Sequence, residues 1–250
     1  RNGVPPVRHA YDIGTAFDAS AGADGPVIAV LCEYDALPGV GHACGHNIIG
    51  TAGLGAGLAA AFVAEAAGGR LRIMGTPAEE GGAGKVHMAR KGAFEGVEAA
   101  MMVHPADADL IRMDTIAIQE LLVQFHGKSA HASAAPWEGR NALDAAVLGY
   151  MNIAAMRQHI RPNERIHGIF TNGGDKPNIV PSEAAMDWYV RAGTIESMQP
   201  LKHRVLTALE SAATACGCTM SHEWDPNPCS DMIDNGPMVA AYVGNAARVG

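Results

Sequence analysis

The sequence contains little of what marks several classes of protein. Among its 250 residues there are 5 cysteines and 5% aromatic residues, and no stretch approaches the roughly 18 consecutive apolar residues of a membrane-spanning helix. The nearest candidate, residues 48–67, is mostly glycine and alanine and contains Glu65. The odd number of cysteines has no framework spacing, which argues against a disulfide scaffold. We therefore expect no membrane span, free or metal-bound thiols, and a cytoplasmic location.

Positive charge is also scarce. The chain has 18 Lys and Arg against 26 Asp and Glu, for a net charge of -8. Because the basic residues form no run, nucleic acid and anionic membranes are not expected partners. The 48% of hydrophobic residues is enough to build a core. Neither an initiator methionine nor a signal peptide opens the first 25 residues, and we expect a fragment of a longer protein.

Short apolar runs alternate with helical stretches in the first 113 residues. Strands are predicted at residues 27–31, 72–75 and 99–103, and helices at residues 48–67 and 85–91. This order is typical of a parallel α/β sheet. Between the first strand and the first helix, Gly45 permits a tight bend, and Asn47 is predicted to cap the helix.

Residues with metal-binding side chains follow each of these three strands. Cys44 and His46 follow the first strand, Glu79 and Glu80 the second, and His104 the third. The carboxyl ends of strands in an open α/β sheet meet at one edge, where ligands bind. Each residue alone also has an ordinary structural explanation, such as a buried thiol or a charged helix start. Their repetition at three strand ends favours a metal site.

The pattern of predicted strands and helices changes at about residue 114, and residues 114–226 predict a second domain. Strands are expected at residues 116–125, 165–170, 184–191 and 218–224, and helices at residues 139–160 and 196–215. The order β-α-β-β-α-β is that of the ferredoxin-like split unit. A Pro-rich hinge at residues 225–228 then predicts that residues 227–250 rejoin the first domain, residues 1–113.

Three polar residues of this inserted domain are candidates for ligand binding. His131 and Asn178 lie in loops rich in small residues, glycine or proline, and Arg191 ends a strand. Each of them alone is more typical of a surface or turn position. Cys216 and Cys218 have the spacing of a metal pair, but they lie at a predicted helix-to-strand turn, and we interpret them as packing residues.

As a set, these motifs resemble those of the M20 metallopeptidases, in the amidohydrolase branch that includes hydrolases of N-acyl amino acids, indole-acetyl amino acids and aminobenzoyl-glutamate. The resemblance covers nearly the whole chain through the stretches YDALP (34–38), HACGH (42–46), PAEE (77–80), HP (104–105), SAH (129–131) and NIVP (178–181). It implies a zinc-peptidase-like, mostly parallel sheet domain with an inserted ferredoxin-like lid that mediates dimerisation. Asn47 stands where most of this branch has Asp, as in a subgroup that cleaves dipeptides of basic amino acids.

The resemblance also implies a set of metal ligands. Cys44 resembles the bridging ligand of two divalent ions, for which zinc is expected first and manganese or cobalt are alternatives. His46 and His104 would complete one ion, and Glu80 would bind the other. The family's last ligand is a histidine near the C-terminus, beyond residue 250. Asp35 resembles the acid that orients the metal site.

The remaining roles concern catalysis and substrate binding. By resemblance, Glu79 is the general base, and His131 stabilises the oxyanion in its own site or in that of the partner subunit. Asn178 and Arg191 would hold a substrate carboxylate. The implied activity is metal-dependent hydrolysis of an amide bond in an N-acyl amino acid or dipeptide-like small molecule, by a homodimer joined through the lid. Two alternatives stay open: a dipeptidase acting on β-alanyl or basic dipeptides, and a non-catalytic metal-binding dimer.

Overall fold

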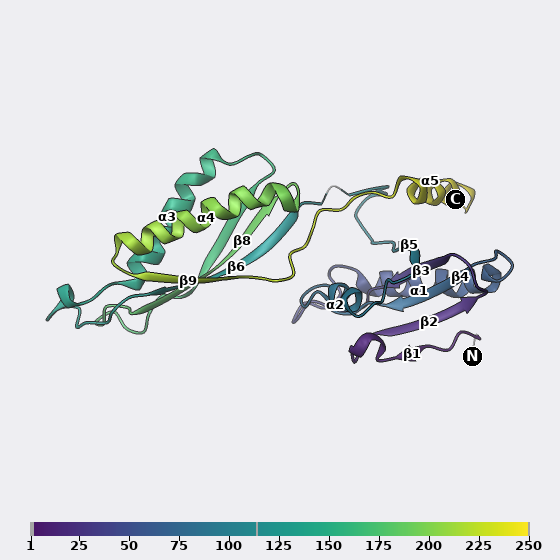
Figure 1. Cartoon of the computed structure of the whole chain (residues 1–250), viewed down its shortest axis with the longest axis horizontal. Coiled ribbons are helices and arrows are strands. Elements are labelled where there is room, and N and C mark those ends of the chain that lie inside the picture. Colours follow the sequence, from purple (N-terminus) through teal and green to yellow (C-terminus); the bar gives the residue numbers. More distant parts are fainter. Residues whose placement is uncertain (1–2, 114, 250) are drawn as a thin grey trace. The chain divides into compact units, whose positions relative to one another are not determined.

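A computed structural model describes residues 3–113 and 115–249 of the chain, which divides into two compact units (Figure 1). The first unit is Arg1–Leu110 and the second is Ile111–Gly250. Each unit has its own sheet and its own buried core. The return of residues 227–250 to the first domain stays a prediction.

The first unit is a mixed sheet with helices between its parallel strands. Its elements are β1 (Val7–Arg8), a 3-10 turn (Ala10–Asp12), β2 (Phe17–Gly22), β3 (Val27–Cys32), α1 (His46–Ala64), β4 (Arg70–Gly75), α2 (Gly84–Arg90) and β5 (Val97–Met101). The strand order is β1-β2-β4-β3-β5, and β3 runs parallel to both β4 and β5. The predicted parallel core and both of its helices are therefore present.

Two antiparallel strands that the sequence analysis did not predict complete this sheet. β2 pairs with β4 from Phe17 opposite Gly75 to Gly22 opposite Arg70, and β1 pairs with β2. Gly75 leaves room for the Phe17 ring, because a Cβ there would lie 2.2 Å from that ring. β2 contains one large apolar side chain and otherwise small or polar residues, so it lacks the alternation that identifies a strand.

Helix α1 packs closely on the strands because two of its glycines face them. A Cβ on Gly53 would lie 2.6 Å from the Leu31 carbonyl oxygen, and one on Gly57 would lie 2.6 Å from the Ile73 side chain. By length and composition α1 could also cross a membrane, but a single such helix is weak evidence. Its contacts with β3 and β4 make it a packing helix of this unit.

Alternating residues of the central strands place α1 and α2 on opposite faces of the sheet. Val30 and Cys32 belong to the cluster that packs with α1, whereas Ala29 packs with Met88 of α2. Both faces of β3 are thus covered, as its continuous apolar sequence predicts. The polar groups that follow β3 therefore emerge at the end of a buried strand.

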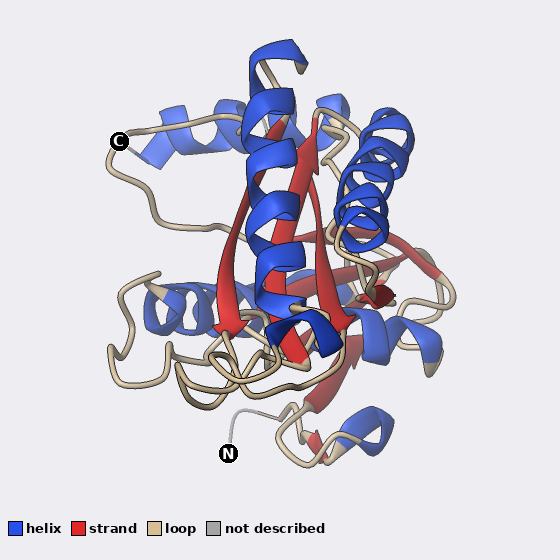
Figure 2. Cartoon of the chain, turned by 90° about the vertical axis from the view of Figure 1, so that its left-hand side faces the viewer, coloured by secondary structure: helices blue, strands red, loops and turns tan. Residues whose placement is uncertain are grey.

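The second unit is an antiparallel sheet with two helices on one face (Figure 2). Its elements are β6 (Ala117–His126), a 3-10 turn (Pro136–Glu138), α3 (Ala142–Met156), a 3-10 turn (Arg157–His159), β7 (Arg165–Asn172), β8 (Glu183–Ala192), α4 (Ile195–Ala215), β9 (Thr219–Trp224) and α5 (Gly236–Val249). The strand order is β7-β8-β6-β9. This is the predicted βαββαβ arrangement, with α5 following it.

The core of the second unit lies between the sheet and helices α3 and α4. Trp188 of β8 and Phe125 of β6 are fully buried there, with Leu209 of α4. Side chains of β6 alternate between this core and the opposite face. Asn141 caps α3 by accepting hydrogen bonds from the amides of Leu143 and Asp144. The helix that was predicted to reach residue 160 ends earlier, at Met156.

Candidate metal centre

The bend between β3 and α1 is built on a glycine. Gly45 has φ 77°, and a Cβ there would lie 2.5 Å from Cγ of Pro105. The turn with Cys44 and His46 can therefore lie directly against the segment that carries His104. The predicted capping role of Asn47 is wrong, because the helix begins one residue earlier, at His46, and Gly45 is its N-cap without a side-chain bond.

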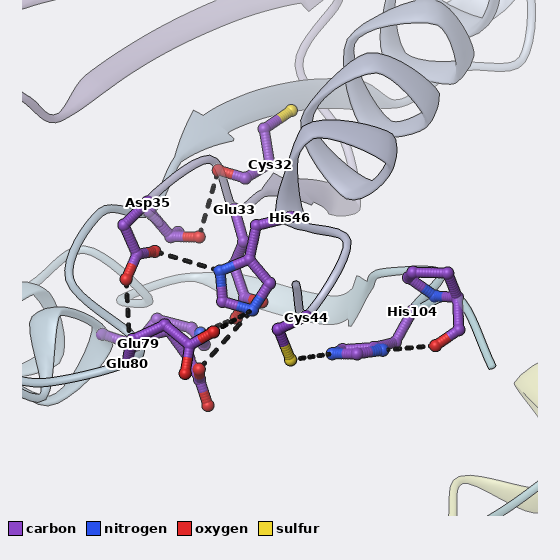
Figure 3. Close-up of polar contacts among 11 residues, drawn as sticks. Cys32, Glu33, Asp35, Cys44, His46, Glu79, Glu80 and His104 are labelled. Atoms are coloured by element: carbon purple, nitrogen blue, oxygen red, sulfur yellow. Dashed lines mark hydrogen bonds and ion pairs between the residues drawn. The ribbon is translucent and has the colours of Figure 1, made fainter. Parts of the chain in front are cut away.

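His46 and His104 each hold Nδ1 in a polar contact, and each turns Nε2 toward the other candidate ligands (Figure 3). Nδ1 of His46 lies 3.3 Å from Oδ1 of Asp35, and Nδ1 of His104 lies 2.8 Å from the Pro105 carbonyl oxygen. Both acceptors take a hydrogen bond from a protonated Nδ1, and in a neutral ring with this tautomer Nε2 carries the free lone pair. The two rings are edge to face, with centroids 5.9 Å apart.

The thiol lies beside these nitrogens. Sγ of Cys44 is 3.6 Å from Nε2 of His104. The candidate ligand atoms of Cys44, His46 and His104 all lie within 4.8 Å of one another. The structure thus brings together residues from two strand ends, as the sequence predicted.

Two carboxylates also lie close to Nε2 of the His46 ring. Its Nε2 lies 3.6 Å from Oε2 of Glu79 and 3.8 Å from Oε1 of Glu80. These residues lie between β4 and α2, in a loop with left-handed backbone at Ala78 (φ 61°) and Ala83 (φ 51°). Such conformations are costly for residues other than glycine and are concentrated at functional sites. We call Cys44, His46, Glu79, Glu80 and His104 the donor cluster.

Asp35 connects the histidine to the acidic loop. Its Oδ2 accepts a hydrogen bond of 2.9 Å from the Glu80 amide, while Oδ1 faces His46. Burial opposes ionisation of Asp35, but the backbone amides of Glu80 and Glu79 and the His46 ring outweigh it and hold its pKa below the usual range. The structure thus places the Asp35 carboxylate against the His46 ring, and its role in orienting a metal site stays a prediction.

The negative charges of the donor cluster act on one another. Partial burial, followed by the neighbouring Glu33 carboxylate, raises the pKa of Glu79. Partial burial and the charges of Glu80, Glu79 and Glu33 raise the pKa of the Cys44 thiol. A bound cation would reverse these effects, because it stabilises both carboxylate and thiolate.

A buried nitrogen without a hydrogen-bond partner indicates that these residues suit a divalent metal ion. Nε2 of His46 is fully buried and has no hydrogen-bond partner among residues 3–113 and 115–249. An unpaired buried nitrogen is expensive unless a ligand satisfies it. Thiolate, imidazole and carboxylate are the donors that zinc takes. Cys44, His46 and His104 would hold one ion, with Glu80 facing a second.

Sequence reasoning missed two charged residues beside this cluster, Glu33 and Lys85. Oε2 of Glu33 lies 3.6 Å from Nε2 of His46, and its other oxygen forms an ion pair with the Lys85 ammonium. The side chain of Glu33 is only 2% exposed. The signal available in the sequence was an acidic residue placed directly after a buried apolar strand.

His131 and Asn178 belong to the second unit, where their two loops pair. The Ala132 amide donates to the Asn178 carbonyl at 3.0 Å, and the Val180 amide donates to the Ala130 carbonyl at 2.9 Å. Nδ1 of His131 accepts from the Ala134 amide at 3.2 Å. This bond leaves Nε2 of His131 as the nitrogen that carries the proton.

Arg191 lies at the far end of strand β8 from this loop pair. β8 begins at Glu183, and the eight residue steps from there to Arg191 span about 26 Å. Nε of Arg191 donates to Nε2 of His167 at 3.2 Å. The structure therefore brings His131 and Asn178 together but does not bring Arg191 to them.

The fold and the donor cluster together define a class of protein. In this class, an α/β unit has candidate metal-binding residues at the ends of its strands and is followed by a separate βαββαβ unit. Residues 118–215 match the peptidase dimerisation domain of the M20 family. The chain is 41% identical over 237 residues to the Xaa-Arg dipeptidase of Mus musculus, covering 93% of this chain and 55% of that protein. It is 37% identical over 254 residues to one of the subunits of the p-aminobenzoyl-glutamate hydrolase of Escherichia coli (strain K12), with 93% of this chain and 53% of that protein covered.

The fold agrees with these matches. The Bacillus subtilis YXEP protein, described as a dinuclear metal binding peptidase from the M20 family, superimposes with a TM-score of 0.74 at 20% identity, over 100% of this chain and 70% of that one. The chain belongs to the M20 metallopeptidase family, in its amidohydrolase branch. It spans about half the length of the curated relatives that it matches.

Proposed function

We propose that this protein hydrolyses an amide bond in an N-acyl amino acid or dipeptide-like substrate and releases an amino acid. The observation that carries the proposal is the buried Nε2 of His46, which has no hydrogen-bond partner among the described residues and lies 3.6 Å from Glu79 and 3.8 Å from Glu80. The candidate ligand atoms of His46, Cys44 and His104 lie within 4.8 Å of one another. Two divalent ions, zinc first and manganese or cobalt as alternatives, would polarise the scissile carbonyl and acidify a water molecule. The names and activities of relatives in the amidohydrolase branch support the same reaction class.

Glu79 is the proposed general base. It takes the proton of the attacking water and returns it to the leaving amine. Its side chain is 46% exposed, against 17% for Glu80. The more accessible carboxylate suits proton exchange with water and substrate, and the more buried one suits a metal ligand.

His131, Asn178 and Arg191 are the proposed substrate contacts. His131 would donate a hydrogen bond to the oxyanion, and Arg191 and Asn178 would bind a substrate carboxylate. Because Arg191 lies about 26 Å along β8 from the loop pair, one carboxylate cannot reach both groups of the same chain. We infer that the protein is a homodimer in which His131 and Asn178 serve the partner's site.

Mixing two inactive variants tests this arrangement. A Glu79→Gln chain keeps its His131, and a His131→Ala chain keeps its Glu79. If His131 acts in the partner's site, mixed dimers regain one complete site and therefore activity. If His131 acts in its own chain, both sites of a mixed dimer stay incomplete. Absence of recovery in dimers shown to have exchanged subunits would contradict the proposal.

A second candidate is cleavage of dipeptides that end in a basic amino acid. The name of the mouse relative, Xaa-Arg dipeptidase, at 41% identity favours this substrate class. A panel of an N-acetyl amino acid, an aminobenzoyl-glutamate and a β-alanyl-lysine dipeptide distinguishes the two through amine release. No cleavage of any member by metal-loaded protein would favour a non-catalytic metal-binding dimer.

All five cysteines, which lie in the described residues, are free, and this supports a cytoplasmic location.

A further inference from the structure

Glu33 and Lys85 form a buried ion pair beneath the donor cluster. Glu33 comes directly after β3, with a side chain 2% exposed, and Lys85 is the second residue of α2, with a side chain 31% exposed. The Lys85 ammonium contacts Oε1 of Glu33. A buried carboxylate is costly without a counter-charge, and the Lys85 ammonium supplies that counter-charge to Glu33.

The second oxygen of Glu33 faces the metal-binding atom of His46. Oε2 lies 3.6 Å from Nε2, and the candidate ligand atoms of Glu33, His46 and Glu79 lie within 4.8 Å of one another. The carboxylate therefore stands between an ammonium on one side and the unpartnered nitrogen on the other. The contact of Lys85 with Oε1 fixes the orientation of the Glu33 carboxylate, so that Oε2 points toward Nε2 of His46.

The same ion pair also spans the acidic loop. It joins the end of β3 to the first turn of α2, and that turn directly follows the loop that carries Glu79 and Glu80. The left-handed residues Ala78 and Ala83 cost free energy that other contacts must offset. At Gly84, next to Lys85, a Cβ would lie 1.8 Å from the Pro77 carbonyl oxygen, so the loop closes tightly there.

We propose that Lys85 and Glu33 are positioning residues of the metal centre. Lys85 holds the Glu33 carboxylate toward Nε2 of His46 and fixes the loop of Glu79 and Glu80, so that the cluster is preset for a divalent cation. The inference rests on the proposed function in one respect, namely that the bound ligand is a divalent cation. It assigns to both residues an effect on metal affinity, which an ion pair that only stabilises the fold would not have.

The test compares zinc affinity among variants of the purified protein by competition with a chromophoric chelator. Lys85→Met and Glu33→Gln should each weaken zinc binding about 10–100-fold, as for residues that orient metal ligands. Lys85→Arg, which keeps the charge, should recover part of the loss. The double variant should lose less than the product of the two single effects, because it leaves no unpaired buried charge. The visible absorption of bound cobalt should change in the same variants.

Lys91→Met is the matched control. Lys91 follows the other end of α2 and forms an exposed pair with Asp12 at 2.8 Å, so its loss should leave zinc affinity unchanged. If Lys85→Met does not fold, the double variant replaces it, and it should still bind zinc at least tenfold more weakly than wild type. Affinity within twofold of wild type and an unchanged cobalt spectrum in a folded Lys85→Met or double variant would overturn the inference.

The two proposals fail separately. A wild-type protein that binds zinc but cleaves no substrate of the panel would refute the hydrolysis, while weakened zinc binding in the variants would still support the positioning role. A wild-type protein that cleaves a substrate, with variants of wild-type zinc affinity, would refute the positioning role alone.

Discussion

Nδ1 of His46 lies 3.3 Å from Oδ1 of Asp35, and this contact decides which nitrogen of the ring is available to a metal. The other oxygen of Asp35 accepts the Glu80 amide at 2.9 Å. One carboxylate thus contacts both the His46 ring and the backbone of the loop that carries Glu79 and Glu80. The candidate ligands are held in position by residues such as Asp35, which would not contact the substrate.

Asp35→Asn should weaken zinc binding about 10–100-fold, because an amide no longer enforces the proton on Nδ1 of His46. Chelator competition measures the change. Asp24→Asn is the control, since Asp24 is 99% exposed in its pair with Arg70 and should leave zinc affinity unaltered. Unchanged affinity in the Asp35 variant would show that the ring needs no such support.

Glu79→Gln should lower kcat by roughly 100- to 10,000-fold while zinc content stays at the wild-type level, because the variant loses a base and keeps the ligands. Amine release and bound metal are measured on the same preparation. Glu98→Gln, an exposed carboxylate of β5, serves as the control. Substantial activity in the Glu79 variant would assign the base to another residue.

Gly45→Ala should destabilise the protein by about 1–2 kcal/mol or more, because a left-handed residue acquires a Cβ. That Cβ would also lie 2.5 Å from Pro105, so it should displace His104 from Cys44 and weaken zinc binding. Urea unfolding and chelator competition test the two effects. Gly55→Ala, at an open position in the same region, should instead stabilise α1 by up to about 1 kcal/mol.

Strand ends and loop composition were enough to predict the donor cluster. Cys44, His46, Glu79, Glu80 and His104 each follow an apolar run, and the parallel sheet carries such positions to one edge. The strands themselves were predicted within a few residues because β3 is buried on both faces and β6 alternates regularly. Periodicity identifies a strand when burial dictates its side chains.

The remaining features depend on packing that periodicity does not encode. β2 has mostly small and polar side chains, and its place beside β4 is fixed by the fit of Phe17 over Gly75. The pair of Glu33 and Lys85 joins residues 52 positions apart whose partnership is visible only in three dimensions. Asn47 has a typical capping residue type, but the bend at Gly45 sets the helix start one residue before it.

His167 should give the second unit a pH-dependent stability. Partial burial, followed by the positive charges of Arg191 and Arg157, lowers its pKa from 6.5. Nε of Arg191 donates to Nε2 of His167, which must be unprotonated to accept. Between the lowered pKa and 6.5 the unfolded chain binds more protons than the folded one, so stability should fall as pH drops below about 6.5.

His167→Gln keeps a hydrogen-bond acceptor for Arg191 and removes the titrating ring. Urea unfolding at pH 7 and at pH 5 should therefore show a smaller loss of stability in this variant than in wild type. His222→Gln, which replaces an exposed histidine of β9, should keep the wild-type loss. Because Arg191 is a proposed substrate contact, protonation of His167 would also add a positive charge beside it and release Nε. An equal pH dependence in wild type and His167→Gln would show that His167 does not cause the loss of stability at low pH.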